Sequence, residues 1–489
     1  MELSIKEAME ATGGQLLCGS PNRKIDNICL NSEKAGPGSL FVPVVGARVD
    51  AHRFLPQVFL KGAACALTAE HTQEDLKEGK DAALCAALQK DKGAALLAVD
   101  NTVSALQRLG AYYRKNKVHI PLIGVTGSVG KTTTREMIAC ALSAGKTVFA
   151  TRGNANSQVG VPITMTEIGP EAQIGVVELG MSEFGEMTRI SMVARPDSAV
   201  ITNIGISHIN QLKTQENILI QKLHILDGMP DGALLLLNGD DPLLRGLTEE
   251  DLHARGIAEG KRVHIVFYGM GENCAVRAEK ITTAKGCPSF EVVFDGFPKE
   301  GACMRYQASL SCMGMHMVSN ALAAFALAAF YGVSPEKAAI KLAGFSDLAG
   351  RGARFVSASG VTVIDDSYNA APASMKAGIS VLMDTPAKRH IAVLADMLEL
   401  GKEEAAYHRE VGAFIARAAQ GLDQLYLYGP LSRFIAEGMG LRIAKVNTRH
   451  FADQTALYDA LKTELKAGDA VLFKGSNSMG LSGLVSRLF

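Results

Sequence analysis

The sequence has no net charge, no paired cysteines and no long apolar run, and each absence excludes a class of protein. Lys and Arg together number 50, as do Asp and Glu, so charge favours neither nucleic acid nor an anionic membrane as a partner. The nine cysteines form no CxxC pair, which indicates buried thiols in a reducing compartment rather than disulfides or zinc ligands. The longest apolar run, residues 321–331, is too short to cross a bilayer.

The start of the chain also lacks the apolar core of a signal peptide, because acidic residues occur within its first seven positions. We therefore expect a cytoplasmic protein that does not enter a membrane, and we expect it to act as a monomer. A length of 489 residues with 47% hydrophobic residues predicts about three domains, at roughly 150 residues for each.

What the sequence does contain is a glycine loop between a predicted strand and a predicted helix. Residues 120–125 are continuously apolar, residues 127–133 read GSVGKTT, and apolar side chains recur at helical spacing in residues 135–142. Glycines let backbone N–H groups close around phosphate oxygens, and the following helix N-terminus favours negative charge. Lys131 would reach the outer phosphates and Thr132 would bind Mg²⁺. The string GxxGKT could also be a chance turn, but the flanking elements favour phosphate binding.

The patterns before and after this loop predict an α/β protein of three domains. Residues 1–99 alternate short apolar runs with turn residues, which predicts a small α/β domain. Because these residues show no acid–base pair and no metal-ligand spacing, we expect this domain to bind a substrate rather than to catalyse. Residues 100–347 contain continuous apolar runs typical of a buried parallel sheet, followed from about residue 261 by an alternating, antiparallel appendage. Residues 348–489 repeat strand and helix patterns, which predicts a Rossmann-like, doubly wound sheet.

Three polar residues of the central region are candidates for a metal site, each with a simpler alternative. Glu178 ends an apolar run at 174–178, where an acid can hold Mg²⁺ or merely face solvent. His208 and Lys222 follow the next run. By pattern alone, the histidine is more often a structural or exposed residue than a ligand, and the default for the lysine is a surface side chain.

The C-terminal region offers further candidates for ligand contacts. Asp365 and Asp366 end an apolar strand, where paired acids suit either a ligand crevice or a turn cap. Arg351 lies at the expected domain junction and can reach a phosphate from there, unless it is only a linker charge. Lys474 begins a glycine and serine loop suited to an anion, although no second motif supports it.

Taken together and in order, the motifs resemble those of the Mur ligases, the ATP-dependent amide-forming enzymes of peptidoglycan precursor synthesis. The motifs are TGxxGKT, GNxNxxxGVP, a strand ending in ELG, NIGxxH, a helix with one lysine, LNxDD, GxHxxxNALAA, GRG and DDSYNAxP. Within the family, ADMLELG with His408 and KGSNSMG at 474–480 are most similar to members that join D-alanyl-D-alanine to UDP-N-acetylmuramoyl-tripeptide. The resemblance therefore implies these two substrates and ATP.

The resemblance also implies roles for individual residues. ATP would contact the glycine loop and three more distant residues: Gly127, Ser128, Val129, Gly130, Lys131, Thr132, Thr133, Asn320, Arg351 and Asp366. Two Mg²⁺ sites would use Thr132, Glu178, His208 and Lys222, the lysine after carbamylation, and catalysis would depend on Lys131 and the last three of these. The substrates would contact Ser32, the 46–50 loop with Asp50, Asn154, Asn156, Asn369, Lys474 and Ser476.

Five positions depart from the family pattern. Met317 stands where most members have Asn, Glu33 replaces an Arg, Ala371 replaces the second Asn of SYNANP, and residues 223–224 replace Gly-Glu. Because the phosphate and metal residues remain, we expect an active enzyme. Two alternatives stay open: a Mur-type ligase that adds a different amino acid, and a nucleotide-binding regulatory protein that has lost ligation.

Overall fold

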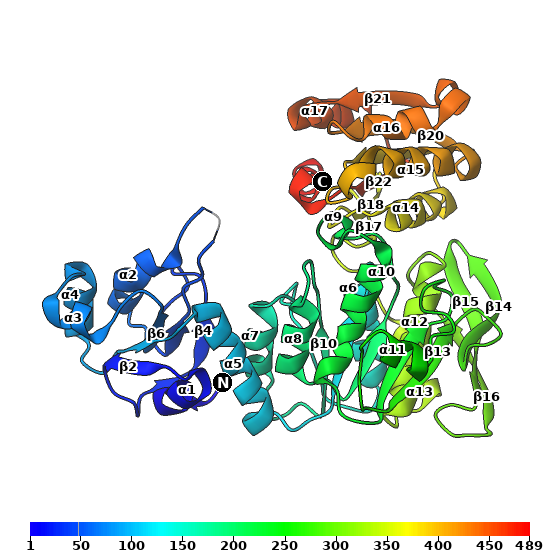
Figure 1. Cartoon of the computed structure of the whole chain (residues 1–489). Coiled ribbons are helices and arrows are strands. Elements are labelled where there is room, and N and C mark those ends of the chain that lie inside the picture. Colours follow the sequence, from blue (N-terminus) through cyan, green and yellow to red (C-terminus); the bar gives the residue numbers. More distant parts are fainter. Residues whose placement is uncertain (47) are drawn as a thin grey trace.

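The protein folds into three units, each built on its own sheet (Figure 1). The structure, a computed structural model, describes residues 1–46 and 48–489. No helix in these residues is long and apolar enough to span a membrane.

The N-terminal unit has a mostly parallel five-stranded sheet in the order β2-β7-β6-β5-β4, beside the small antiparallel pair β1-β3. Its elements are β1 (Leu3–Ser4), α1 (Ile5–Thr12), β2 (Gln15–Cys18), β3 (Lys24–Ile25), β4 (Asn27–Cys29), β5 (Ser39–Phe41), η1 (Ala51–Phe54), α2 (Leu55–Leu60), β6 (Cys65–Thr68), α3 (Gln73–Glu78), α4 (Ala82–Lys90) and β7 (Ala95–Ala98). Helix α5 (Thr102–Lys117) then leads into the central unit, and the Asn101 side chain caps its first turn.

The central sheet has nine strands, and its parallel part carries the glycine loop. Strands β9 (Val148–Ala150), β10 (Ile174–Glu178), β8 (Leu122–Thr126), β11 (Ser198–Ile201), β12 (Ala233–Asn238) and β13 (Val263–Gly269) lie side by side and parallel. The continuous apolar runs are buried on both faces, as expected for such strands. The helices that cover them are α6 (Lys131–Leu142), α7 (Gly160–Glu167), α8 (Glu186–Ala194), α9 (Ile209–Leu212), α10 (Gln215–Leu223), η2 (His224–Gly228) and α11 (Glu249–Ala254).

The predicted antiparallel appendage begins later than residue 261 and continues the same sheet. Strand β13 pairs in parallel with β12, and only β14 (Val276–Ala284), β15 (Cys287–Asp295) and β16 (Cys303–Ser309) form antiparallel pairs. Helices α12 (His316–Phe330) and α13 (Pro335–Ala343) pack against α6 on one side of the sheet. Because α12 is buried through most of its length, its alanine-rich, nearly all-apolar sequence suits the position.

The C-terminal unit is a doubly wound sheet in the order β17-β18-β22-β19-β20-β21. All of its strands are parallel except the edge strand β17. Its elements are β17 (Ala353–Val356), β18 (Thr362–Asp366), α14 (Pro372–Asp384), β19 (Arg389–Ala395), η3 (Gly401–Glu403), α15 (Glu404–Ala418), β20 (Leu422–Tyr428), α16 (Arg433–Gly438), η4 (Gly440–Lys445), β21 (Asn447–Phe451), α17 (Gln454–Glu464), β22 (Asp469–Lys474), η5 (Asn477–Met479) and α18 (Leu481–Leu488).

This arrangement brings the carboxyl ends of two parallel sheets to one place. Strand β8 leads into the glycine loop, β10 ends at Glu178, and β11 ends two residues before Asn203. In the C-terminal unit, β18 ends at Asp366 and β22 at Lys474. Ligands of open α/β sheets bind at such ends. The junction between the central and C-terminal units is therefore the place to look for a site.

Candidate active site

The glycine loop takes a conformation that side chains would obstruct. A Cβ on Gly127 would lie 1.9 Å from Thr202 Oγ1, so the loop can approach β11 only with glycine at this position. Gly130 is left-handed and stands at the N-cap of α6, whose first N–H groups therefore face the loop. The Lys131 ammonium folds back to donate to the Gly127 carbonyl at 2.8 Å. The loop thus has the geometry of an anion cradle.

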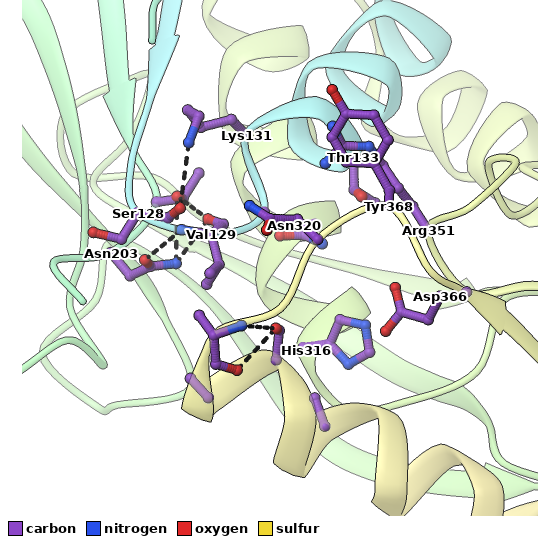
Figure 2. A pocket seen from close by; sticks show the side chains of 18 of the residues that line it. Ser128, Val129, Lys131, Thr133, Asn203, His316, Asn320, Arg351, Asp366 and Tyr368 are labelled. Carbon is purple, nitrogen blue, oxygen red and sulfur yellow. Dashed lines mark hydrogen bonds between the residues drawn. The ribbon is translucent and has the colours of Figure 1, made fainter. Parts of the chain in front are cut away.

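Asn203 holds the loop in place, a role that the sequence patterns did not reveal. Its side-chain amide accepts from Val129 N at 3.0 Å and donates to Val129 O at 2.9 Å. Its carbonyl accepts from Ser128 N at 3.0 Å, and Ser128 Oγ accepts from Gly205 N at 2.8 Å. Figure 2 shows Asn203 next to Ser128 and Val129. The conformation of the loop is therefore fixed from the neighbouring strand.

Glu178 is the centre of a buried polar cluster next to the loop. Its Oε2 accepts from Thr132 Oγ1 at 2.9 Å and from Arg135 Nη1 at 3.0 Å, and its Oε1 accepts from Asn156 Nδ2 at 2.7 Å. The Glu178 side chain is 2% exposed and that of Arg135 is 3% exposed. Sequence patterns did not single out Arg135, because a charge on a predicted helix reads as a surface residue.

Lys222 and His208 lie near Lys131 and form a cluster of basic side chains. Burial lowers the pKa of Lys222 well below its usual range, and the positive charge of Lys131 lowers it further. Burial also lowers the pKa of His208, and Lys131 and Lys222 lower it further. The Glu399 carboxylate partly opposes this lowering. The influences on the Lys222 amine are its burial and the charge of Lys131, and neither is a hydrogen bond or an ion pair. A deprotonated, nucleophilic amine is therefore favoured at this position.

A cavity of about 550 Å³ opens between the central and C-terminal units. Its lining contains these predicted residues: Ser128, Val129, Gly130, Lys131, Thr133, Asn154, Asn156, Glu178, His208, Asn320, Arg351, Asp366, Asn369 and Lys474. Residues far apart in the sequence thus line one cavity, and its volume suits a ligand of nucleotide size.

The C-terminal unit contributes a buried ion pair to this cavity. Lys474 Nζ lies 2.5 Å from Asp366 Oδ2 and also donates to the Asn369 carbonyl at 3.1 Å. Burial raises the pKa of Asp366, and Lys474 opposes that rise. The Arg351 guanidinium stacks on the Tyr368 ring at 3.9 Å and reaches toward the loop (Figure 2). Tyr368 is a further residue that the sequence reasoning did not assign.

Asn320 and His316, on α12, form another part of the lining. Asn320 Oδ1 accepts from Thr134 Oγ1 at 3.0 Å and so ties α12 to α6. Desolvation in the cavity and the positive charge of Lys474 lower the pKa of His316 to about 4. His316 is therefore a neutral imidazole near pH 7. Met317, at the departing position, is buried and its sulfur lies 3.7 Å from Asn320 Nδ2.

Some predicted residues lie behind or away from this cavity. Gly127, Thr132 and Lys222 are not in its lining, although Thr132 bonds to Glu178 and the charge of Lys222 acts on lining His208. Ser476 is buried and its hydroxyl accepts from Leu398 N at 2.9 Å, which is a structural contact.

The predicted residues of the N-terminal unit are not brought to the cavity. The Ser32 carbonyl accepts from Lys61 Nζ at 2.9 Å, and the Asp50 carboxylate caps the turn at His52. Figure 1 shows this unit on the far side of α5 from the junction. Within the predicted 46–50 loop, Ala47 lies outside the described residues.

Comparison with known proteins identifies the class. Residues 125–328 match the family described as "Mur ligase middle domain", and residues 350–477 match "Mur ligase, glutamate ligase domain". The chain belongs to the Mur ligases.

Two relatives found by sequence are UDP-N-acetylmuramoyl-tripeptide–D-alanyl-D-alanine ligases. The chain is 33% identical to that of Bacillus subtilis over 95% of its own length and 93% of the relative's. It is 34% identical to that of Synechocystis, over 96% and 93%.

Solved structures agree with this. MurF from Acinetobacter baumannii superposes with a TM-score of 0.83 at 28% identity, over 100% of this chain and 99% of the other. MurF ligase from Thermotoga maritima in complex with ADP superposes with a TM-score of 0.76 at 26% identity, over 95% and 96%. The predicted family and the three-domain α/β fold are confirmed.

Proposed function

We propose that the protein is an ATP-dependent ligase that joins D-alanyl-D-alanine to UDP-N-acetylmuramoyl-tripeptide. The observation that carries this proposal is the cavity in which the glycine loop faces Asp366 and Lys474 of the C-terminal unit. The names of relatives that match nearly the whole chain supply the substrates.

The reaction needs activation of a carboxylate. The tripeptide carboxylate attacks the γ-phosphorus of ATP, which forms an acyl phosphate and ADP. The amine of D-alanyl-D-alanine then attacks the acyl carbon, the C–O bond breaks, and inorganic phosphate leaves from a tetrahedral intermediate. A junction between units suits this chemistry because it excludes water that would hydrolyse the acyl phosphate.

The glycine loop and Lys131 would hold the phosphates of ATP. To do so, the Lys131 ammonium exchanges its bonds to Gly127 and Ser128 carbonyls for phosphate oxygens. Arg351, Asn320 and Asp366 would contact the rest of the nucleotide from the opposite walls. Asn154 and Asn156 would lie in the loop that faces the acceptor, D-alanyl-D-alanine, and Asn369 and Lys474 would contact substrate from the C-terminal side.

The donor set beside the loop fits Mg²⁺. Thr132 Oγ1 and Glu178 Oε2 are hard oxygen donors that already lie 2.9 Å apart, and such oxygens are the ligands that Mg²⁺ prefers. His208, with Lys222 as a carbamate, would hold a second ion. Bound Mg²⁺ supplies charge neutralisation on the transferred phosphoryl group.

Carbamylation of Lys222 fits the environment of its amine. Only the deprotonated amine reacts with CO₂, and burial together with the charge of Lys131 favours that form. The product is a carboxylate-like oxygen ligand in place of a buried cation.

We further propose that residues 1–99 bind the UDP-sugar, with Ser32 and Asp50 among the contacts, and that residues 100–347 and 348–489 form the other two domains. The N-terminal unit would carry the UDP part while the peptide extends to the cavity. Cytoplasmic location and a monomeric state remain predictions.

The test is phosphate release from ATP and Mg²⁺ with UDP-N-acetylmuramoyl-tripeptide, with and without D-alanyl-D-alanine. We expect release that depends on both. Phosphate release with the tripeptide and a different amine would still indicate a Mur ligase, but one whose acceptor is not D-alanyl-D-alanine. No release with any amine would contradict ligation and favour a nucleotide-binding protein.

A further inference from the structure

His208 and Glu399 meet across the junction between the central and C-terminal units. His208 Nδ1 lies 2.7 Å from Glu399 Oε2. Both residues are left-handed, with φ of 62° and 64°, a conformation that non-glycine residues seldom adopt. Two strained positions in different units thus present their side chains to each other, and such strain persists only where the surroundings impose it.

The loop that carries Glu399 is held rigidly by its own unit. Leu398 N donates to Ser476 Oγ at 2.9 Å, and Met397 N donates to His408 Nε2 at 3.0 Å. Ser476 thus supports this loop through its hydroxyl. Glu399 is therefore presented by a fixed backbone and moves only with the C-terminal unit.

The two loops also touch beside this pair. A Cβ on left-handed Gly401 would lie 3.5 Å from the Asn210 Cα on α9, so the backbones are in close contact. Figure 1 shows α9 at the top of the central unit, beneath the C-terminal sheet. The approach of Glu399 to His208 thus belongs to the docking of one unit on the other.

The orientation of the imidazole decides what this contact does. Nδ1 is buried, whereas 31% of the His208 side chain is exposed and the residue lines the cavity. Nδ1 therefore faces Glu399 and the exposed edge of the ring faces the cavity. In this structure the Nδ1–H is within reach of the carboxylate but not aligned for a full hydrogen bond. A neutral imidazole that donates through Nδ1 keeps an acceptor lone pair on Nε2.

We propose that Glu399 is a positioning residue for the second metal site, which it completes from the C-terminal unit by orienting His208. The proposal rests on the proposed function, in which His208 holds the second ion. Metal-binding histidines commonly donate their other N–H to a carboxylate, which fixes the tautomer and increases the basicity of the ligand. Here the carboxylate belongs to another unit, so the metal site becomes competent only when the two units dock.

Mn²⁺ binding to the full chain tests this without turnover. With a non-hydrolysable ATP analogue and the UDP-linked tripeptide, paramagnetic resonance should count two Mn²⁺ per wild-type chain. Glu399→Gln should weaken one of the two by about 10- to 100-fold, the usual effect of removing such a partner, and leave the other unchanged. The matched control is Glu403→Gln, because Glu403 is an exposed acid in η3. Equal binding by wild type and Glu399→Gln would overturn the proposal, as would a single Mn²⁺ in the wild type.

A double variant separates action through His208 from action elsewhere. If Glu399 acts through the ring, His208→Ala with Glu399→Gln should bind Mn²⁺ and turn over no worse than His208→Ala alone. Glu399→Gln should lower kcat and leave the KM for D-alanyl-D-alanine within about twofold. Additive losses, or a rise in that KM, would overturn the proposal and assign Glu399 to the acceptor. A wild type without acceptor-dependent phosphate release would contradict the proposed function instead.

Discussion

The Thr132 hydroxyl donates to the Glu178 carboxylate at 2.9 Å, although the two residues are 46 positions apart. One begins the helix after the glycine loop, and the other ends the adjacent parallel strand. Their contact shows that the loop and the acid already form one oxygen-lined site without a bound ion. It also suggests the substitution Thr132→Val, which replaces only the hydroxyl of the side chain by a methyl group.

Thr132→Val removes the hydroxyl and keeps the shape of the side chain, so we expect phosphate release to fall by about 100-fold, comparable to loss of one preorganised electrostatic contact. Thr132→Ser keeps the hydroxyl and should stay within a few-fold of wild type. Steady-state phosphate release compares the two variants. Equal turnover in both would show that the hydroxyl is not a ligand.

Lys131→Ala tests the loop. Because the ammonium bonds only to loop carbonyls in the described residues, 1–46 and 48–489, its loss should leave the fold intact. We expect ADP formation to become undetectable while the melting temperature stays close to that of wild type. ADP release at the wild-type rate would remove Lys131 from the mechanism.

The sequence predicted the main sheet strands well because they are buried on both faces. Strand β10 has the predicted bounds, Ile174–Glu178, since a continuous apolar run contains little ambiguity about its length. Strands β17 and β21 were not predicted, because both are largely exposed edge strands without an apolar pattern. The more fully a strand is buried, the more clearly its apolar pattern predicts it from the sequence.

The sequence predicted those site residues that belong to motifs, but not those whose role depends on a single contact in the folded protein. The glycine loop and Glu178 follow from strand endings. The hydrogen bonds of Asn203 to Val129 and the burial of Arg135 depend on which strands are neighbours in the sheet. The order of strands in a sheet cannot be read from a single sequence. Ser476 shows another limit, because the sequence does not reveal that its hydroxyl accepts from the backbone N–H of Leu398 on a neighbouring loop.

Lys474→Met should destabilise the C-terminal unit, because it leaves the Asp366 carboxylate without its partner. Lys474 is 2% exposed and Asp366 22% exposed in their side chains, so we expect a loss of up to about 3 kcal/mol, the lower end of the range for buried pairs. Adding Asp366→Asn should recover most of it. Thermal melting of both variants tests this, and a wild-type melting temperature for Lys474→Met would contradict it.

Asp347 predicts a pH dependence of stability. Burial raises the pKa of Asp347 to about 6. Arg354 opposes this rise, and the charge of Asp366 adds to it. Since the folded pKa lies above the unfolded one, the group contributes most stability below about pH 4, and that contribution is lost as pH rises through 6.

Asp347→Asn lacks this loss, so its stability relative to wild type should rise between pH 4.5 and pH 7.5. The gain is at most about 3 kcal/mol at 1.36 kcal/mol per pKa unit. Melting temperatures of the two proteins across this range provide the measurement. A difference that does not change with pH would show that Asp347 titrates normally.

Lys222→Ala removes the amine that we expect to be carbamylated. Because the residue is 2% exposed, the substitution leaves a cavity of side-chain size in which a small carboxylic acid can bind and provide the missing oxygen ligand. We expect turnover near zero and partial recovery with added formate or acetate.

The control is Lys213→Ala, since Lys213 is exposed at the end of α9 and should show neither loss nor recovery. Lys222→Arg should also be inactive without rescue, because a guanidinium fills the space and cannot react with CO₂. Full activity of Lys222→Ala without added acid would contradict carbamylation.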